Sequence, residues 1–96
     1  MKYDLTELVD RCKKHDVMAQ KELYEAYKSI LFGICRRYLL HWEDAEDVLT
    51  ESFVKIFTKL DDYKGDGSFE GWMKKITVNE ALMFLRKNKI HFQELD

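Results

Sequence analysis

The spacing of apolar residues over residues 43–60 constrains the fold more than any other feature of this sequence. Apolar and small side chains recur there every three or four residues, and acidic or polar side chains occupy the opposite side. This is the period of an α-helix with one buried face. Because such a face must be covered by other elements, the segment predicts a packed domain. The predicted buried face consists of Ala45, Val48, Leu49, Ser52, Phe53, Ile56 and Leu60.

Three further segments show a helical pattern, and none predicts a strand convincingly. They span about residues 4–14, residues 17–40 behind Asp16 as an N-cap, and residues 68–89. An apolar content of 46%, an aromatic content of 14% and the absence of proline agree with a mainly helical core. We therefore predict one all-α domain, a small bundle of about four helices. Its last three helices are expected to pack around Tyr27, Ile34, Val48, Phe53, Ile56, Trp72 and Ile76.

The two ends of the chain and its cysteines carry weaker signals. We expect residues 1–90 to form the domain, and residues 91–96, which lose the helical period, to be a tail or the start of a linker to a C-terminal domain that this sequence lacks. No apolar run follows Met1 as in a signal peptide, and no stretch approaches the roughly 18 apolar residues of a membrane span. Cys12 and Cys35 lack a Cys-x-x-Cys spacing. Their separation favours reduced thiols and a cytoplasmic location over a disulfide framework.

The titratable residues do not form a recognisable catalytic or metal site. His15, His41 and His91 lie at separate element ends, and none has a second histidine three or four residues away. The carboxylates of residues 43–51 face water in the predicted helix, so burial does not prepare them for acid–base chemistry. The Gly-Asp-Gly segment at residues 65–67 lacks the lysine and the preceding strand of a phosphate-binding loop. We predict a protein that is not an enzyme and that needs no metal or cofactor.

A stretch rich in Gly, Asp and Ser separates the last two predicted helices, over residues 61–72. Gly65 and Gly67 permit positive φ angles and therefore a tight, irregular turn. Ser68 is a candidate N-cap for the helix that follows. Planar rings beside free backbone N–H groups could hold an unstacked base, and the alternative is a helix–helix connection whose aromatic residues belong to the core. The aromatic residues in question are Tyr63, Phe69 and Trp72.

Two predicted helix faces are candidates for binding a partner. The formal net charge of −2 argues against a protein that coats DNA, so a nucleic-acid contact must use a local basic face. The last helix offers such a face in one row, and ordinary surface lysines are the alternative. The acidic face of the helix over residues 43–60 includes the apolar Val54 and Phe57. It could dock a basic partner helix, and the alternative is a solvated face that tolerates two apolar residues. The basic row consists of Lys75, Asn79, Leu82 and Arg86.

Three motifs and a short basic run occur in order along the chain. Residues 23–27 are Leu-Tyr-Glu-x-Tyr, and residues 44–53 are Asp-Ala-Glu-Asp-Val-Leu-Thr-Glu-Ser-Phe. Residues 67–79 follow the pattern Gly-Ser-Phe-x-x-Trp-Met-x-x-Ile-x-x-Asn, and residues 85–87 are Leu-Arg-Lys. Together they resemble region 2 of a bacterial RNA polymerase sigma factor of the extracytoplasmic-function (ECF) group. The resemblance covers nearly the whole chain.

This resemblance implies a role in transcription initiation. The helix over residues 43–60 would bind the coiled coil of the polymerase β′ clamp through Asp47, Thr50, Glu51, Val54 and Phe57. The loop that follows would capture a flipped base from the non-template strand of the promoter −10 element, and the last helix would contact promoter DNA. An anti-sigma factor is a further implied partner. The implied DNA-binding residues are Tyr63, Lys64, Asp66, Ser68, Phe69, Lys74, Lys75, Asn79, Arg86 and Lys87.

Two other functions stay open at this point. A sigma-like mimic would keep the fold, bind an anti-sigma factor and not bind DNA. Thr50 and Met83, which stand where the family usually has Gln and Asp, leave room for such a mimic. A plain helical adaptor would be indifferent to the loop sequence. The aromatic loop and the basic residues of the last helix favour promoter binding over both.

Overall fold

The computed structural model describes residues 5–95, with side chains described for residues 5–88. Its helices are α1 (Leu5–Lys13), α2 (Val17–Tyr38), α3 (Trp42–Thr58) and α4 (Phe69–Leu95), and a short 3-10 helix, η1, spans Leu60–Asp62. No strand occurs among these residues. The predicted all-α class and the four predicted helices are confirmed.

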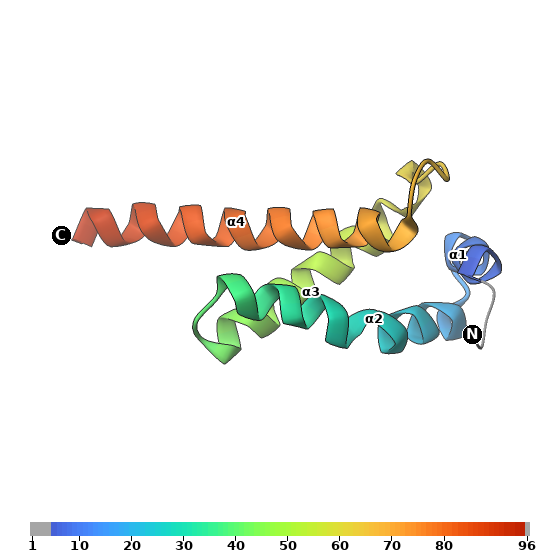
Figure 1. The fold of residues 1–96 in the computed structure, drawn as a ribbon, viewed down its shortest axis with the longest axis horizontal. Coiled ribbons are helices and arrows are strands. Elements are labelled where there is room, and N and C mark those ends of the chain that lie inside the picture. Colours follow the sequence, from blue (N-terminus) through green and yellow to red (C-terminus); the bar gives the residue numbers. More distant parts are fainter. Residues whose placement is uncertain (1–4, 96) are drawn as a thin grey trace.

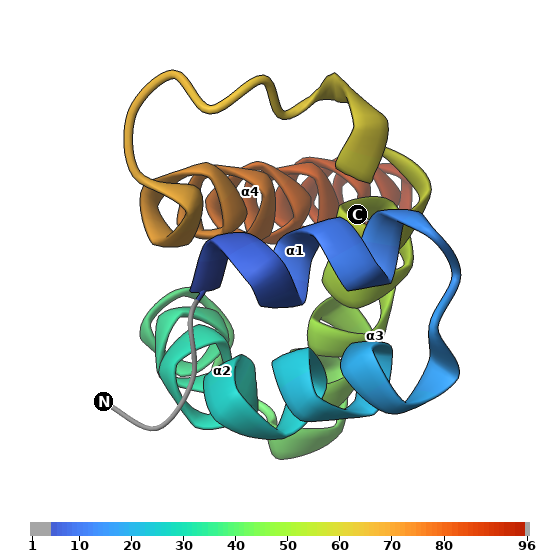
Figure 2. The same ribbon diagram turned by 90° about the vertical axis from the view of Figure 1, so that its right-hand side faces the viewer.

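The helices form a bundle with one long member (Figure 1, Figure 2). α3 packs against both α2 and α4, and α1 crosses one end of this group and packs mainly against α2. The C-terminal part of α4 projects beyond the other helices, which gives the molecule a longest dimension of 51 Å (Figure 1). In the described part of the chain, none of these helices is both long and apolar enough to cross a bilayer.

The largest difference from the predicted boundaries lies at the end of α4. The first three helices begin and end within about two residues of their predicted limits. α4 begins after Ser68 as predicted but continues to Leu95, beyond the predicted end at residue 89. A formed helix adds one hydrogen bond for each further residue, so it can extend past the last residue that tertiary packing holds. Residues 91–95 are therefore helical, and Asp96 lies outside the described residues.

The main core draws on all four helices. Leu8 of α1, Leu23 and Leu31 of α2, Ile56 of α3 and Met73 of α4 are almost completely buried in one cluster. Most of the residues predicted for the core are buried as well, namely Tyr27, Ile34, Val48 and Phe53.

Trp72 and Ile76 depart from the predicted core, because both are only partly buried at its edge. α4 turns Met73, Thr77 and Ala81 inward instead, each with no exposed surface. The buried Thr77 hydroxyl donates a hydrogen bond to the Met73 carbonyl oxygen at 3.0 Å, so a polar side chain can occupy this face without an unpaired group. A helix that is apolar over much of its circumference does not reveal by its period which sector its neighbours cover.

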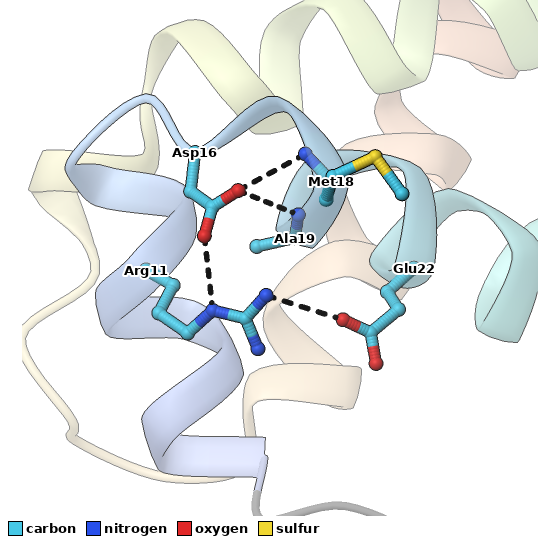
Figure 3. A network of polar contacts seen from close by, with 5 residues as sticks. All are labelled: Arg11, Asp16, Met18, Ala19 and Glu22. Carbon is cyan, nitrogen blue, oxygen red and sulfur yellow. Dashed lines mark hydrogen bonds and ion pairs between the residues drawn. The ribbon is translucent and has the colours of Figure 1, made fainter.

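The turn between α1 and α2 is held by the Asp16 carboxylate (Figure 3). One oxygen accepts hydrogen bonds from the backbone N–H groups of Met18 and Ala19 at 3.0 and 3.2 Å, which confirms Asp16 as an N-cap. The other oxygen accepts from Arg11 Nε at 3.1 Å, and a second guanidinium nitrogen of Arg11 lies 3.5 Å from Glu22. The hydrogen bond from Arg11 is the main cause that holds the pKa of Asp16 below its usual value. Together these contacts fix the end of α1 against the start of α2.

Two isoleucines, Ile56 of α3 and Ile30 of α2, provide a matched test of the core. Ile56 has no exposed surface, whereas the Ile30 side chain is 42% exposed. We expect Ile56→Ala to lower the free energy of unfolding by about 2–5 kcal/mol, because it removes buried methylene groups and leaves a cavity. Ile30→Ala should change it by less than about 1 kcal/mol. Urea unfolding followed by circular dichroism measures both, and equal losses would contradict this packing.

The pH dependence of stability tests the Asp16 network. Asp16→Asn keeps a capping oxygen but removes the charge that faces Arg11. Because folding lowers the pKa of Asp16, its ionised form stabilises the fold at neutral pH, and this contribution disappears as the pH falls through the lowered pKa. The unmodified chain should therefore melt at a higher temperature than Asp16→Asn near pH 7, and the gap should close as the pH falls through the lowered pKa of Asp16. A gap that does not change with pH would show that the charge contributes nothing.

Candidate nucleic-acid interface

A hydrogen bond from one tyrosine joins the two ends of the loop between η1 and α4. The Tyr63 hydroxyl donates a hydrogen bond to the Gly67 carbonyl oxygen at 2.7 Å. Gly65 and Gly67 have φ angles of 89° and 78°, a conformation that glycine adopts without a steric penalty. The two glycines therefore let the chain turn back tightly enough for the phenol to reach Gly67.

Three aromatic rings pack together at the base of this loop. The ring centroid of Tyr63 lies 5.1 Å from that of Phe69 and 5.6 Å from that of Trp72, and the Phe69 and Trp72 rings stack at 5.5 Å. Phe69 is only 4% exposed, whereas Tyr63 and Trp72 are half-buried. The rings thus form a rigid base for the loop and do not stand free in solvent.

A cavity of about 500 Å³ lies between this loop and α1. Its volume is within the range of small-ligand pockets. The loop contributes Tyr63, Lys64, Gly65 and the edge of the buried Phe69, and α1 contributes Leu5, Thr6, Val9, Asp10 and Lys13. The Lys13 ammonium donates a hydrogen bond to the Tyr63 carbonyl oxygen at 3.0 Å across this boundary. The cavity combines an aromatic and apolar wall with charged groups, which is a composition suited to a planar polar ligand.

Ser68 joins the loop to α4 as its N-cap. Its hydroxyl oxygen accepts a hydrogen bond from the Gly71 backbone N–H at 3.0 Å, as the sequence predicts. Of the loop residues predicted to bind DNA, Lys64, Asp66 and Ser68 are exposed. The hydroxyl proton of Ser68 stays available to a further partner.

The predicted basic row of α4 lies along one exposed side of the helix. Lys75, Asn79 and Arg86 are all exposed. Lys74 points about 100° away from Lys75 and forms an ion pair with Glu70 at 2.9 Å. The row is therefore separate from Lys74, although the sequence groups the two lysines together.

A small groove beside this row adds two lysines that the sequence-based prediction missed. Lys55 and Lys59, in and directly after the last turn of α3, line it together with Asn79 and Glu80. Lys55 forms an ion pair with Glu80, whose side chain is 9% exposed, at 2.5 Å. This leaves Lys59 as an exposed cation beside Asn79. The four-residue spacing of the two lysines was a signal of a shared face, but it does not reveal that α4 lies alongside.

The predicted polymerase-binding residues share the outer side of α3. Asp47, Thr50, Glu51 and Val54 are exposed, and Phe57 is half-buried with its ring stacked on Phe53 at a centroid distance of 6.0 Å. A groove of about 360 Å³ runs between this side and α4. Its lining includes Asp47, Thr50 and Glu51 from α3 and Met83, Phe84 and Lys87 from α4. The fold thus brings Lys87, predicted to bind DNA, next to the acidic face.

Comparison with known proteins identifies the family. The sequence pattern of the sigma-70 region 2 family matches residues 23–90. The chain belongs to this family. The site described above therefore belongs to a region 2 domain. The resemblance that the motifs predicted is confirmed.

Relatives of this region 2 domain include ECF sigma factors of several bacteria. It is 35% identical over 78 residues to the ECF RNA polymerase sigma-E factor of Escherichia coli and 32% identical over 78 residues to that of Haemophilus influenzae. These matches cover 81% of this chain but only 40% and 41% of the relatives. The chain spans less than half the length of the curated relatives it matches.

A solved structure shares the fold of this region 2 domain. It is the NMR structure of a complex formed by an engineered region 2 of sigmaE with GTAAAA. The two chains are 28% identical and superpose with a TM-score of 0.83 over 92% of each. The all-α bundle predicted from the sequence is thus the sigma region 2 fold.

The roles of the individual residues in this region 2 domain stay predictions. The fold brings together Tyr63, Lys64 and Phe69 around one cavity, and Asp47, Thr50 and Glu51 along one groove. The sequence-based prediction did not include Lys13, which contacts the loop from α1. Its partner is 50 residues away in the chain, so no local pattern reveals the contact.

Proposed function

We propose that this chain is a sigma factor domain that binds the RNA polymerase core and recognises and opens the promoter −10 element. One observation carries the proposal: the match to a region 2 domain that was solved in complex with GTAAAA, over 92% of both chains. On this proposal the non-template strand of the −10 element is the strand that the domain binds.

The loop over residues 63–69, which we name the base-capture loop, is the part proposed to select sequence. A base that leaves the duplex stack needs an aromatic or apolar surface and hydrogen-bonding groups at its edge. The cavity beside this loop offers both, with Tyr63 and Phe69 in its wall and Lys64 at its rim. Opening the duplex costs a few kcal/mol per unstacked step, and capture of one or two bases offsets part of this cost.

The exposed row of α4 is proposed to hold the DNA backbone. Lys75 and Arg86 are exposed and not paired with carboxylates in the described part of the chain, so their charges are available to phosphates. Phosphate contacts position a protein on DNA but carry no sequence information directly. Asn79, between them on the same side, can accept and donate hydrogen bonds to a base edge or a phosphate.

The outer side of α3 is proposed to dock on the β′ clamp of the polymerase. Glu51 and Asp47 supply negative charge, and the 49% exposed Val54 supplies an apolar contact beside them. Charged residues around an apolar centre give a docking surface both association speed and affinity. An anti-sigma factor is proposed as a further partner on the basis of the family resemblance alone.

DNA binding by the chain tests base capture. We expect it to prefer single-stranded non-template −10 DNA over the complementary strand, by the modest margin that one or two captured bases provide at about 1–3 kcal/mol each. Exchange of residues 64–68 for those of another ECF factor should change the preferred base at one position only. Fluorescence anisotropy with labelled oligonucleotides measures this, and equal affinity for every base at every position would contradict base capture.

Variants of the basic row are compared with the loop exchange in the same DNA titrations. Lys75→Ala and Arg86→Ala should weaken binding to all sequences alike, and each should reduce the slope of log affinity against log salt by about 0.7. Lys21→Ala, at an exposed lysine on α2, is the control for net charge and should leave the slope unchanged. A loss of base preference in the Lys75 variant would assign that residue to sequence recognition instead.

Charge reversal on α3 tests the polymerase contact. Asp47→Lys and Glu51→Lys should each weaken binding to core polymerase by more than about tenfold, because a basic partner would then face a like charge. Glu25→Lys on α2 makes the same change in net charge on another exposed helix and should have little effect. Affinity for the polymerase core is measured by pull-down and titration, with circular dichroism to confirm folding. If all three variants bind like the unmodified chain, this side of α3 is not the docking surface.

A further inference from the structure

We infer that α1 belongs to the base-recognition apparatus and that Lys13 is a positioning residue for the base-capture loop. The inference rests on the proposed function of that loop. The family pattern begins at residue 23, so α1 lies outside the matched segment. The family pattern therefore does not describe the contact between α1 and the loop, which is a hydrogen bond from Lys13 to Tyr63.

Lys13 holds the loop where it begins. Its ammonium donates a hydrogen bond to the backbone carbonyl oxygen of Tyr63 at 3.0 Å, and the side chain is half-buried. A charged donor forms a stronger hydrogen bond than a neutral one. The contact joins the C-terminal end of α1, which Asp16 and Arg11 fix against α2, to the first residue of the loop. Lys13 thus fixes the position of the loop relative to the helical bundle.

Tyr63 transmits this restraint across the loop. Its backbone is held by Lys13, and its hydroxyl donates to the Gly67 carbonyl oxygen at 2.7 Å. Between these two points, Lys64, Gly65 and Asp66 make no hydrogen bond to other residues that the structure describes. Gly65 and Gly67 also lower the free-energy cost of alternative backbone conformations of the loop. The conformation of residues 64–67 therefore depends on two hydrogen bonds that share Tyr63.

The cavity beside the loop takes its shape from the same contact. Lys13 and Asp10 are among the residues of its α1 wall, and Lys64 and Gly65 are among those of the facing wall. A shift of the loop away from α1 would change the distance between these walls and so the fit of a captured base. Because all bases share a similar stacking face, such a change should reduce discrimination among bases more than total affinity.

Three variants of the 96-residue chain separate positioning from charge. Lys13→Met keeps most of the aliphatic length and removes the donor, and Lys14→Met makes the same change in net charge at an adjacent exposed lysine. Lys13→Arg restores a charged donor. Each is titrated with single-stranded −10 oligonucleotides that differ at the position the loop recognises, and ¹⁵N relaxation reports the order of residues 64–67 without DNA.

We expect Lys13→Met to reduce the ratio of affinities for the preferred and other bases by about threefold to tenfold, the effect of one hydrogen bond of ordinary net strength. The order parameters of residues 64–67 should fall in the same variant. Lys14→Met should leave both unchanged, and Lys13→Arg should restore them. Tyr63→Phe, which removes only the hydroxyl, should lower the same order parameters.

The affinity ratios and the order parameters test the DNA-binding proposal and the role of Lys13 separately. Equal effects of Lys13→Met and Lys14→Met on the affinity ratio and the order parameters would overturn the inference, because charge alone would then explain them. Unchanged order parameters in Lys13→Met would also overturn it, whatever the DNA titrations give. If the unmodified chain shows no base preference, the proposed function of the loop fails, and a fall in order confined to Lys13→Met still establishes the contact as a restraint on the loop.

Discussion

The packing of α3 between α2 and α4 is the interaction on which both candidate surfaces depend. Ile56 is completely buried in this contact, and the buried Glu80 of α4 pairs with Lys55 of α3 at 2.5 Å. A buried carboxylate is stable only with such a partner, so the pair restricts how α4 can lie against α3. With the inner face of α3 held in this way, Asp47 and Glu51 must point outward, and α4 must present its basic row along a different side. One packing arrangement therefore sets the directions of both surfaces.

The base-capture loop differs from these helices, because few contacts hold this segment, which is proposed to bind DNA. The loop itself is exposed, and its base is a cluster of three aromatic rings that belong partly to the core. Binding segments on a rigid scaffold are commonly found in such loops, since they cannot be buried and still reach a partner. Here the rigid support comes from two sides, from Phe69 at the start of α4 and from Lys13 at the end of α1.

Much of this structure was predictable from local sequence, and the parts that were not are contacts between distant segments. The helical period located all four helices, and the short-range preferences of Asp16 and Ser68 identified two N-caps. The period did not show that Trp72 lies at the edge of the core, because the apolar sector of α4 is wider than the surface its neighbours cover. Lys13 was missed for a related reason. A lysine at the end of a helix suits the helix dipole wherever it occurs, and only the fold reveals that a carbonyl oxygen lies within reach.

The groove between α3 and α4 contains charged residues from both proposed binding surfaces. Lys87 lines it together with Asp47 and Glu51, so a cation of α4 lies within the field of the acidic face. A basic clamp helix docked on α3 would meet this positive charge at the margin of its site, and like charges brought together at an interface repel each other. Lys87 is exposed and has a long side chain, so it can turn away from the groove at small cost. On the proposed assignment, Lys87 therefore lies where the acidic face of α3 meets the basic side of α4, so a partner docked on one surface would meet a charge of the other.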